Sequence, residues 1–259
     1  ALGAGIYLAG QIFNMAEHWP GALMLWSFGA AAGVWLLRQW PQVLWLAVLA
    51  PAWRWGEWIE AQLPQEFYHG MTPAAIGLFL LACTYLMARS PGAVASWRRA
   101  LAWLGAIALI PTAKLISYTT VDVWLLAEQP AGQLGVGALV TAWALAIVLP
   151  FVLAFCLRGR TALYLLAALA WALLVTQVDP RHDAGQLAMH ALLALGSAGL
   201  VLWGVKDQQR LAVNVGVLGF ALAVFGFYFS SVFDKLDRAL GLIGIGVIFI
   251  GGGWLLERA

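Results

Sequence analysis

The stretch ALGAGIYLAGQIFNMAEHWP, from Ala1 to Pro20, decides how we interpret the whole chain. It is apolar enough for a short helix, yet polar side chains recur along it at positions i, i+4, i+7 and i+11, namely Tyr7, Gln11, Asn14 and His18. This spacing places the four side chains on one face of a helix. Because lipid offers polar groups no partner, we expect this polar seam to face protein or water. The stretch therefore predicts a membrane helix against which other helices pack.

The composition of the chain is that of an integral membrane protein. Hydrophobic residues make up 63% and charged residues 10%, whereas soluble domains carry about 25% charged residues. The formal net charge of +2 is small and the basic residues are dispersed, which argues against a nucleic-acid partner. Cys83 and Cys156 lie in apolar segments, so we interpret them as small buried residues. We expect one transmembrane domain over residues 1–259, in contact with the lipid bilayer.

Pro, Gly and charged residues divide the chain into about ten apolar segments, most of them near the length that a membrane helix needs. The expected spans are 2–17, 21–38, 42–60, 73–89, 98–118, 134–157, 161–177, 184–204, 211–232 and 238–256. The fold class that follows is an all-α, polytopic membrane bundle. Because Ala1 lies inside the first span, with no Met or basic segment before it, we also expect native sequence to precede it.

Charged residues are sorted between the two ends of these spans. Nine of the fourteen Lys and Arg residues fall at even-numbered junctions, and three fall at odd-numbered ones. Since basic residues concentrate on the cytoplasmic side, both ends of the chain are predicted to be cytoplasmic. Ten of the twelve carboxylates and all four histidines then map to the outer half.

Polar residues on four predicted helices reach a similar depth in this outer half. They are Tyr7, Gln11 and Asn14, then Arg54 and Glu57, then Lys114 and Tyr118, then Gln186 and His190. Gln11, Arg54 and His190 lie about 10 Å from the outer boundary, counted at the helical rise. Because ionisable residues within a membrane mark candidate functional sites, we predict an outward-facing pocket that binds or transports a small solute or ion. Arg54 and Lys114 would attract an anionic group, and His190 would titrate near neutral pH.

Each of these residues also has a simpler explanation. Arg54 could pair with Glu57, Lys114 could extend to the interface, and His190 could be a hydrogen-bonded packing residue. Gln11 and Asn14 could join helices. In that case the protein is a non-transporting scaffold or sensor subunit that docks a membrane-protein partner or a second copy of itself. The inner half carries few polar side chains and no charged one, which disfavours a simple channel.

Motifs for enzymes, metals and cofactors are missing from the sequence. HExxH, CxxC, GxSxG, Walker and dinucleotide-binding patterns are all absent. We therefore predict no metal, no cofactor and no catalytic residue. Two alternatives stay open: an intramembrane enzyme that uses the outer pocket, and a metal site formed by His18, His69, His182 and nearby carboxylates.

Both ends of the chain resemble an uncharacterised family. The segment GAGIYLAGQIFNMAEHWPGALMLW, residues 3–26, is similar to the first helix, polar turn and Trp-bearing helix of domain-of-unknown-function family 2157. The segment from Arg210 to Arg258 is similar to that family's closing helical hairpin. The resemblance implies a bacterial multi-pass inner-membrane protein with further helices before residue 1. It brings no activity, and the polar positions that it matches are Gln11, Arg210 and Asn214.

Overall fold

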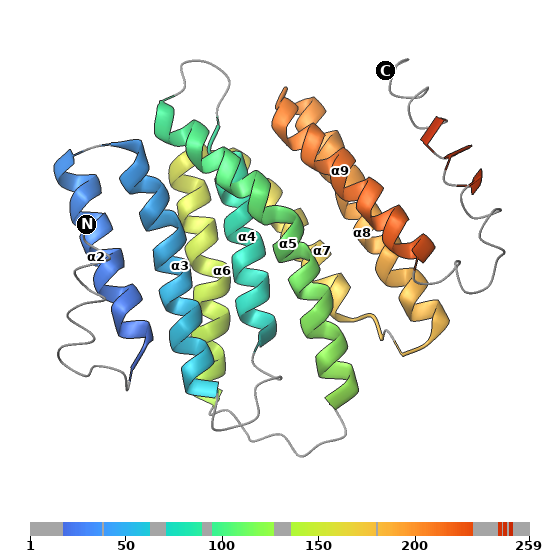
Figure 1. Ribbon diagram of the computed structural model, residues 1–259, viewed down its shortest axis with the longest axis horizontal. Coiled ribbons are helices and arrows are strands. Elements are labelled where there is room, and N and C mark those ends of the chain that lie inside the picture. Colours follow the sequence, from blue (N-terminus) through green and yellow to red (C-terminus); the bar gives the residue numbers. More distant parts are fainter. Residues whose placement is uncertain are drawn as a thin grey trace. The chain divides into compact units, whose positions relative to one another are not determined.

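The computed structural model describes residues 18–37, 39–62, 71–89, 95–126, 136–179 and 181–229, together with residues 243, 244, 246, 247, 249 and 250. Its elements are α2 (Pro20–Leu37), α3 (Trp40–Gln62), α4 (Met71–Met87), α5 (Ser96–Leu126), α6 (Val136–Arg158), the 3-10 helix η2 (Gly159–Leu163), α7 (Tyr164–Thr176), α8 (Asp183–Lys206) and α9 (Arg210–Phe227). Every regular element in these ranges is helical (Figure 1), which confirms the all-α prediction.

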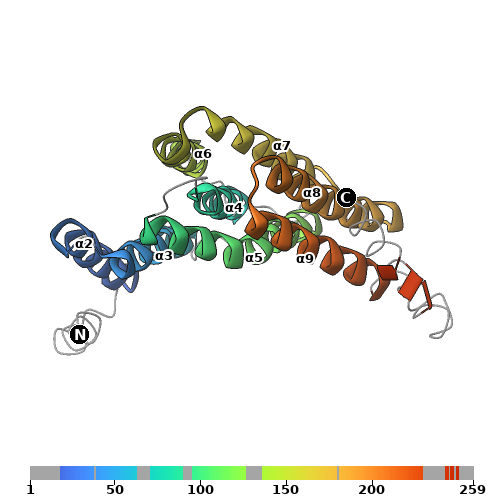
Figure 2. The same ribbon diagram turned by 90° about the horizontal axis from the view of Figure 1, so that it is seen from above.

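The chain divides into two compact units, which are described separately. Unit 1 covers Ala1–Thr176 and contains α2 to α7, whereas unit 2 covers Gln177–Ala259 and contains α8 and α9. Figure 2 shows the same helices from above, where α2 and α3 lie side by side and α4 lies between α5 and α6.

The prediction of about ten spans is wrong. The described residues contain five helical stretches long and apolar enough to cross a membrane: Pro20–Leu37, Ser96–Thr120, Leu139–Thr176, Asp183–Lys206 and Arg210–Phe227. The predicted spans 2–17 and 238–256 lie outside the residues that the structure describes, except for a few positions near the end of the second.

Three further differences account for the smaller number of spans. Helix α3 covers the predicted span 42–60, but Arg54, Glu57 and Glu60 lower its hydropathy. Helix α4 is shorter than a spanning helix. The predicted spans 134–157 and 161–177 form one apolar stretch, although the backbone changes direction at Gly159, where φ is +60°.

Helices α2 and α3 form an antiparallel hairpin in unit 1. Small residues on one helix face large residues on the other: the Trp19 ring packs on Gly56, and the Gln42 side chain packs on Gly33. Between these two contacts the rings of Trp26 and Trp45 stack with centroids 5.5 Å apart. The start of α2 therefore lies beside the end of α3.

Helices α5 and α6 pack against α4 in unit 1. Most of the α4 residues are buried, so this helix is the centre of the packing. Gly77 on α4 faces Ala146 on α6, and Thr84, further along α4, donates a hydrogen bond of 3.3 Å to the carbonyl of Pro150. The later residue of α4 contacts the later residue of α6, so these two helices run parallel. Gly105 of α5 approaches Ala82 of α4, whereas the earlier residue Leu101 packs with the later residue Ala88, so α5 runs antiparallel to both.

Arginine side chains join the helix ends at one end of unit 1. Arg98, in the first turn of α5, donates a hydrogen bond of 3.2 Å to the carbonyl of Leu157 near the end of α6. Arg158, the last residue of α6, donates one of 3.1 Å to the carbonyl of Arg89, just after α4. These bonds satisfy carbonyl groups that a helix C-terminus leaves without a partner. The charge sorting predicted from the sequence thus gathers arginines from three helices at one place.

Unit 2 is a tight hairpin of α8 and α9. Glycines allow the two backbones to approach: Gly204 faces Val213, and Gly216 faces Val201 and the Ser197 carbonyl. The helices are joined through Gln208, which has a φ of +54°. Close packing of this kind is typical of helices that associate within membranes, where small residues provide the contact surface.

Candidate functional site

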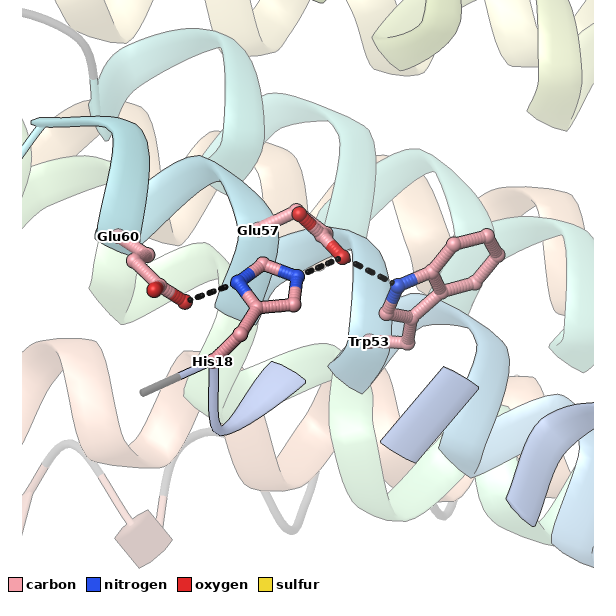
Figure 3. Close-up of polar contacts among 4 residues, drawn as sticks. All are labelled: His18, Trp53, Glu57 and Glu60. Atoms are coloured by element: carbon pink, nitrogen blue, oxygen red, sulfur yellow. Dashed lines mark hydrogen bonds and ion pairs between the residues drawn. The ribbon is translucent and has the colours of Figure 1, made fainter. Parts of the chain in front are cut away.

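The most developed polar cluster among the described residues lies where α2 begins and α3 ends (Figure 3). His18 immediately precedes Trp19 and Pro20, and Pro20 is the first residue of α2, a position that suits proline because no backbone N–H is needed there. Glu57 and Glu60 lie three residues apart on α3, so both carboxylates project from one face. The hairpin thus brings His18 to a pair of carboxylates 39 residues or more along the chain.

The imidazole of His18 contacts both carboxylates at once. Its Nε2 lies 3.2 Å from Glu57 Oε1, and its Nδ1 lies 3.1 Å from Glu60 Oε2. Only a protonated imidazole can donate from both ring nitrogens, so the doubly contacted ring fits the charged form. The contact with Glu60 is an ion pair, and that with Glu57 is also a hydrogen bond.

Aromatic residues hold Glu57 in place. Trp53, one turn before it on α3, donates a hydrogen bond of 2.8 Å from Nε1 to Glu57 Oε1. The Trp53 ring in turn packs against Phe28 of α2, with ring centroids 6.1 Å apart. One carboxylate oxygen therefore accepts from both a tryptophan and a histidine, and these two bonds fix its position.

The environment of His18 raises its pKa above the ordinary value of 6.5. The contact with Glu60 is the largest cause and raises the pKa, desolvation opposes it, and the hydrogen bond and charge of Glu57 raise the pKa further. The His18 side chain is 55% exposed, so water and salt screen these interactions. His18 is therefore the group of this cluster whose charge responds to pH, with a pKa above the ordinary histidine value.

The predicted pocket residues of unit 1 are only partly described. Tyr7, Gln11 and Asn14 lie outside the described residues. Arg54 is exposed on α3, and within the described part it makes no ion pair with Glu57, whose partners are His18 and Trp53. Lys114 and Tyr118 are both exposed on α5, one turn apart.

The remaining predicted pocket residues, Gln186 and His190, lie on α8 in unit 2. His190 Nδ1 lies 2.8 Å from the backbone carbonyl of Gln186, which identifies Nδ1 as the protonated nitrogen of this contact. The His190 ring packs edge-on against Phe227 of α9, with centroids 5.8 Å apart, and lies over Gly226. This geometry is that of the hydrogen-bonded packing residue named as the simpler explanation.

Hydroxyl side chains inside the helices also bond locally. Their oxygens donate to carbonyl groups three or four residues earlier on the same chain; they belong to Ser27, Thr84, Thr112, Thr119, Thr120, Thr161, Thr176 and Ser197. Such bonds are the usual way for Ser and Thr to satisfy their hydroxyl groups within a helix. These donors are directed along their own helices, whereas a ligand site would need them to converge on one point.

Within the described ranges, no group of three or more His, Cys, Asp or Glu residues is placed to hold a metal ion. The His18 cluster contains three such residues, but Glu57 and Glu60 contact opposite edges of the imidazole. A metal needs its ligand atoms to converge on one centre. His69 lies outside the described residues.

Sequence reasoning named Glu57 as a pocket residue and His18 as part of the polar seam, but it did not pair them. The signal was present in the charge sorting, which placed both residues at the outer end of neighbouring spans. Predicting the pairing requires the orientation of α2 about its own axis. This orientation depends on which faces of α2 and α3 pack together, and the sequence of one helix does not contain that information.

The helices described above define a candidate multi-pass membrane protein whose apolar surfaces suit contact with a lipid bilayer. Comparison of the chain with protein-family models, curated proteins and solved structures finds no match.

Proposed function

We propose that this protein is a non-transporting scaffold or sensor subunit of a bacterial inner membrane, in which polar seams hold helices together. The observation that carries the proposal is the contact of His18 with Glu57 and Glu60 across the α2–α3 hairpin. His18 is the one described member of the polar seam of the first helix, and it joins helices. The proposal includes membership of domain-of-unknown-function family 2157, which rests on the resemblance of both chain ends.

Two further observations support the proposal. His190 is directed into packing between α8 and α9, and the eight Ser and Thr hydroxyl groups named above bond to carbonyl groups three or four residues earlier in the chain. Arginines gather at one end of unit 1, whereas His18, Glu57 and Glu60 lie at the other end of α2 and α3. Under the positive-inside rule, the arginine end faces the cytoplasm and the His18 end faces outward. A sensor subunit would then present its titratable cluster to the outside.

Cysteine accessibility tests this proposal. Single cysteines at positions 7, 11 and 190 would be placed in a Cys83→Ser/Cys156→Ser background, and a membrane-impermeant thiol reagent would be applied from each side in turn. A packed scaffold predicts no labelling at these positions from either side. Labelling from the outside alone would overturn the scaffold in favour of a ligand pocket, and labelling from both sides would indicate alternating access.

The second candidate function is binding or transport of a small anionic solute in an outward-facing pocket. The observation that favours it is that Arg54 on α3 and Lys114 on α5 are exposed cations without an ion pair in the described part of the chain. Helices α3 and α5 pack together, so two positive charges on them could serve one anionic group. The labelling experiment separates this candidate from the first one.

A further inference from the structure

Five arginines lie at the end of unit 1 where α4 and α6 finish and α5 starts, at the top of Figure 1. They are Arg89, Arg98, Arg99, Arg158 and Arg160, and we call them the arginine cluster. The hydrogen bonds from Arg98 to the Leu157 carbonyl and from Arg158 to the Arg89 carbonyl bring three of these residues together, and Arg99 and Arg160 lie one and two residues further along the chain. The Arg98 guanidinium, which bonds the Leu157 carbonyl through Nη1, has other N–H groups that can bind an anion.

The arginine cluster has no carboxylate of its own. The segments 88–99 and 157–161 contain neither Asp nor Glu. The described carboxylates of α3, Glu57 and Glu60, lie at the opposite end of the α2–α3 hairpin, against His18. Positive charges gathered at one end of a unit repel one another, so an anion bound among them would stabilise this end.

The packing beneath the arginine cluster is dense, which makes this surface a fixed one. Leu81, Tyr85, Ala88 and Leu101 form a buried cluster there, with Trp97 and Leu157 packed against it. Tyr85 donates a hydrogen bond of 3.1 Å to the Ala47 carbonyl of α3, and the Arg98 guanidinium lies 5.1 Å from the centre of the Trp97 ring. The arginines are therefore attached to helix ends that are already held in place.

Exposed apolar side chains lead from the arginine cluster along α6. Val148, Val152 and Phe155 share one helical face and are 56%, 54% and 64% exposed. Arg160 is exposed just beyond this face, in η2, and Arg99 is exposed in the first turn of α5. A ligand that matches both the arginine cluster and the apolar face of α6 needs an anionic group such as phosphate at one end and hydrocarbon at the other.

We propose that the arginine cluster binds the phosphate headgroup of an anionic phospholipid, whose acyl chain lies along the Val148, Val152 and Phe155 face of α6. Arginine is suited to this role because its planar N–H groups bind phosphate oxygens in pairs. Basic groups at the cytoplasmic ends of membrane helices face the leaflet that is rich in anionic lipid. The inference goes beyond the proposed function and rests only on the chain spanning a membrane.

The test is lipid binding by the full chain purified in a mild neutral detergent. The melting temperature would be followed as phosphatidylglycerol, phosphatidylcholine or inorganic phosphate is added. We expect phosphatidylglycerol alone to raise the melting temperature in a saturable way. The Arg99→Gln/Arg160→Gln variant should bind phosphatidylglycerol on the order of tenfold more weakly, since each basic residue contributes modestly to such binding.

A matched control removes two exposed cations elsewhere. Lys206→Gln/Arg210→Gln, at two exposed residues of unit 2, has the same change in net charge and should keep the response to phosphatidylglycerol. An equal loss in both double variants would overturn the proposal, as would an equal response to phosphatidylcholine or to inorganic phosphate. If Arg99→Gln/Arg160→Gln does not fold, Arg99→Lys/Arg160→Lys takes its place. That variant keeps the charge but not the paired N–H geometry, and binding as tight as in the parent chain would contradict a site built on arginine.

Discussion

At the scale of single residues, His18 shows how one titratable group can join two helices. The imidazole lies between Glu57 and Glu60, and Trp53 orients the first of these carboxylates. The carboxylates raise the pKa of His18, with Glu60 as the largest cause. A histidine with a raised pKa stabilises the folded state while it is protonated, and its contribution is fully present below the pKa of the unfolded chain.

This behaviour predicts a pH-dependent hairpin. As pH rises through the raised pKa of His18, the ion pairs are lost and the start of α2 should open more readily from α3. Hydrogen exchange of the first α2 amides, measured from about pH 6 to about pH 9 and corrected for intrinsic exchange, should show protection that declines as pH rises. His18→Gln should remove this decline, whereas His182→Gln, an exposed residue before α8, should keep it. The same pH profile in the parent chain and in His18→Gln would show that His18 does not control the hairpin.

A second prediction at this scale concerns Trp53 and Glu57. Trp53→Phe keeps the ring against Phe28 but removes the N–H that donates to Glu57 Oε1. Loss of one such bond should cost about 1 kcal/mol of stability, measured by urea or thermal unfolding in detergent. Trp45→Phe, which keeps the stacking with Trp26, is the matched control and should cost less. Equal costs would mean that the indole does not hold Glu57.

At the scale of elements, the α4–α5 pair depends on Gly105. A Cβ atom at this position would overlap the backbone of α4 at Ala82 and Leu86, so only glycine allows the two helices to approach as they do. Ala82, Ala102 and Ala106 are all buried in the same part of unit 1. In a membrane, lipid is as apolar as the side chains, so the hydrophobic effect does not drive helices together. Close contact between small residues stabilises the packing instead.

Gly105→Ala should therefore force α4 and α5 apart. Overpacking of this kind costs about 1–3 kcal/mol, which should appear as a lower melting temperature in detergent. Gly199→Ala on α8 is the control, because its added methyl group meets nothing within 4 Å. Since alanine is the better helix former, Gly199→Ala should be neutral or stabilising by about 0.5–1 kcal/mol. Equal destabilisation by both substitutions would contradict the close approach at Gly105.

At the scale of the whole molecule, charge is sorted along the helices of unit 1. The arginine cluster lies where α4 and α6 end, and the His18 cluster lies where α2 starts and α3 ends. Because the two clusters mark opposite ends of the hairpin and the bundle, an orientation that places one inside the cell places the other outside.

This sorting predicts opposite labelling of the two ends. In a background without Cys83 and Cys156, Ser96→Cys near the arginine cluster should react with an impermeant reagent only from the cytoplasmic side. His18→Cys should react only from the outer side. Both positions are exposed, so lack of access cannot explain a difference between the two sides. Labelling of both residues from the same side would show that the orientation inferred from charge is wrong.

The sequence was most informative where the physics is local. It placed α2 at 21–38, α6 at 134–157 and α8 at 184–204, each within two residues of the ends observed. Hydropathy and charge along one helix suffice for this, since lipid sorts segments one at a time. The number of spans was overestimated for three reasons: α3 is too polar to count as a span, α4 is too short, and the predicted spans 134–157 and 161–177 form one apolar stretch.

By itself, the sequence predicted an all-α fold with helices apolar enough to cross a membrane, and the described residues confirm both. Only the tertiary structure decided that His18 binds Glu57 and Glu60, that Arg98 and Arg158 join three helices, and that His190 packs on Phe227. Each of these contacts depends on how helices rotate and how closely they approach. Rotation and approach follow from the fit of small and large side chains on two facing surfaces, which no single segment contains.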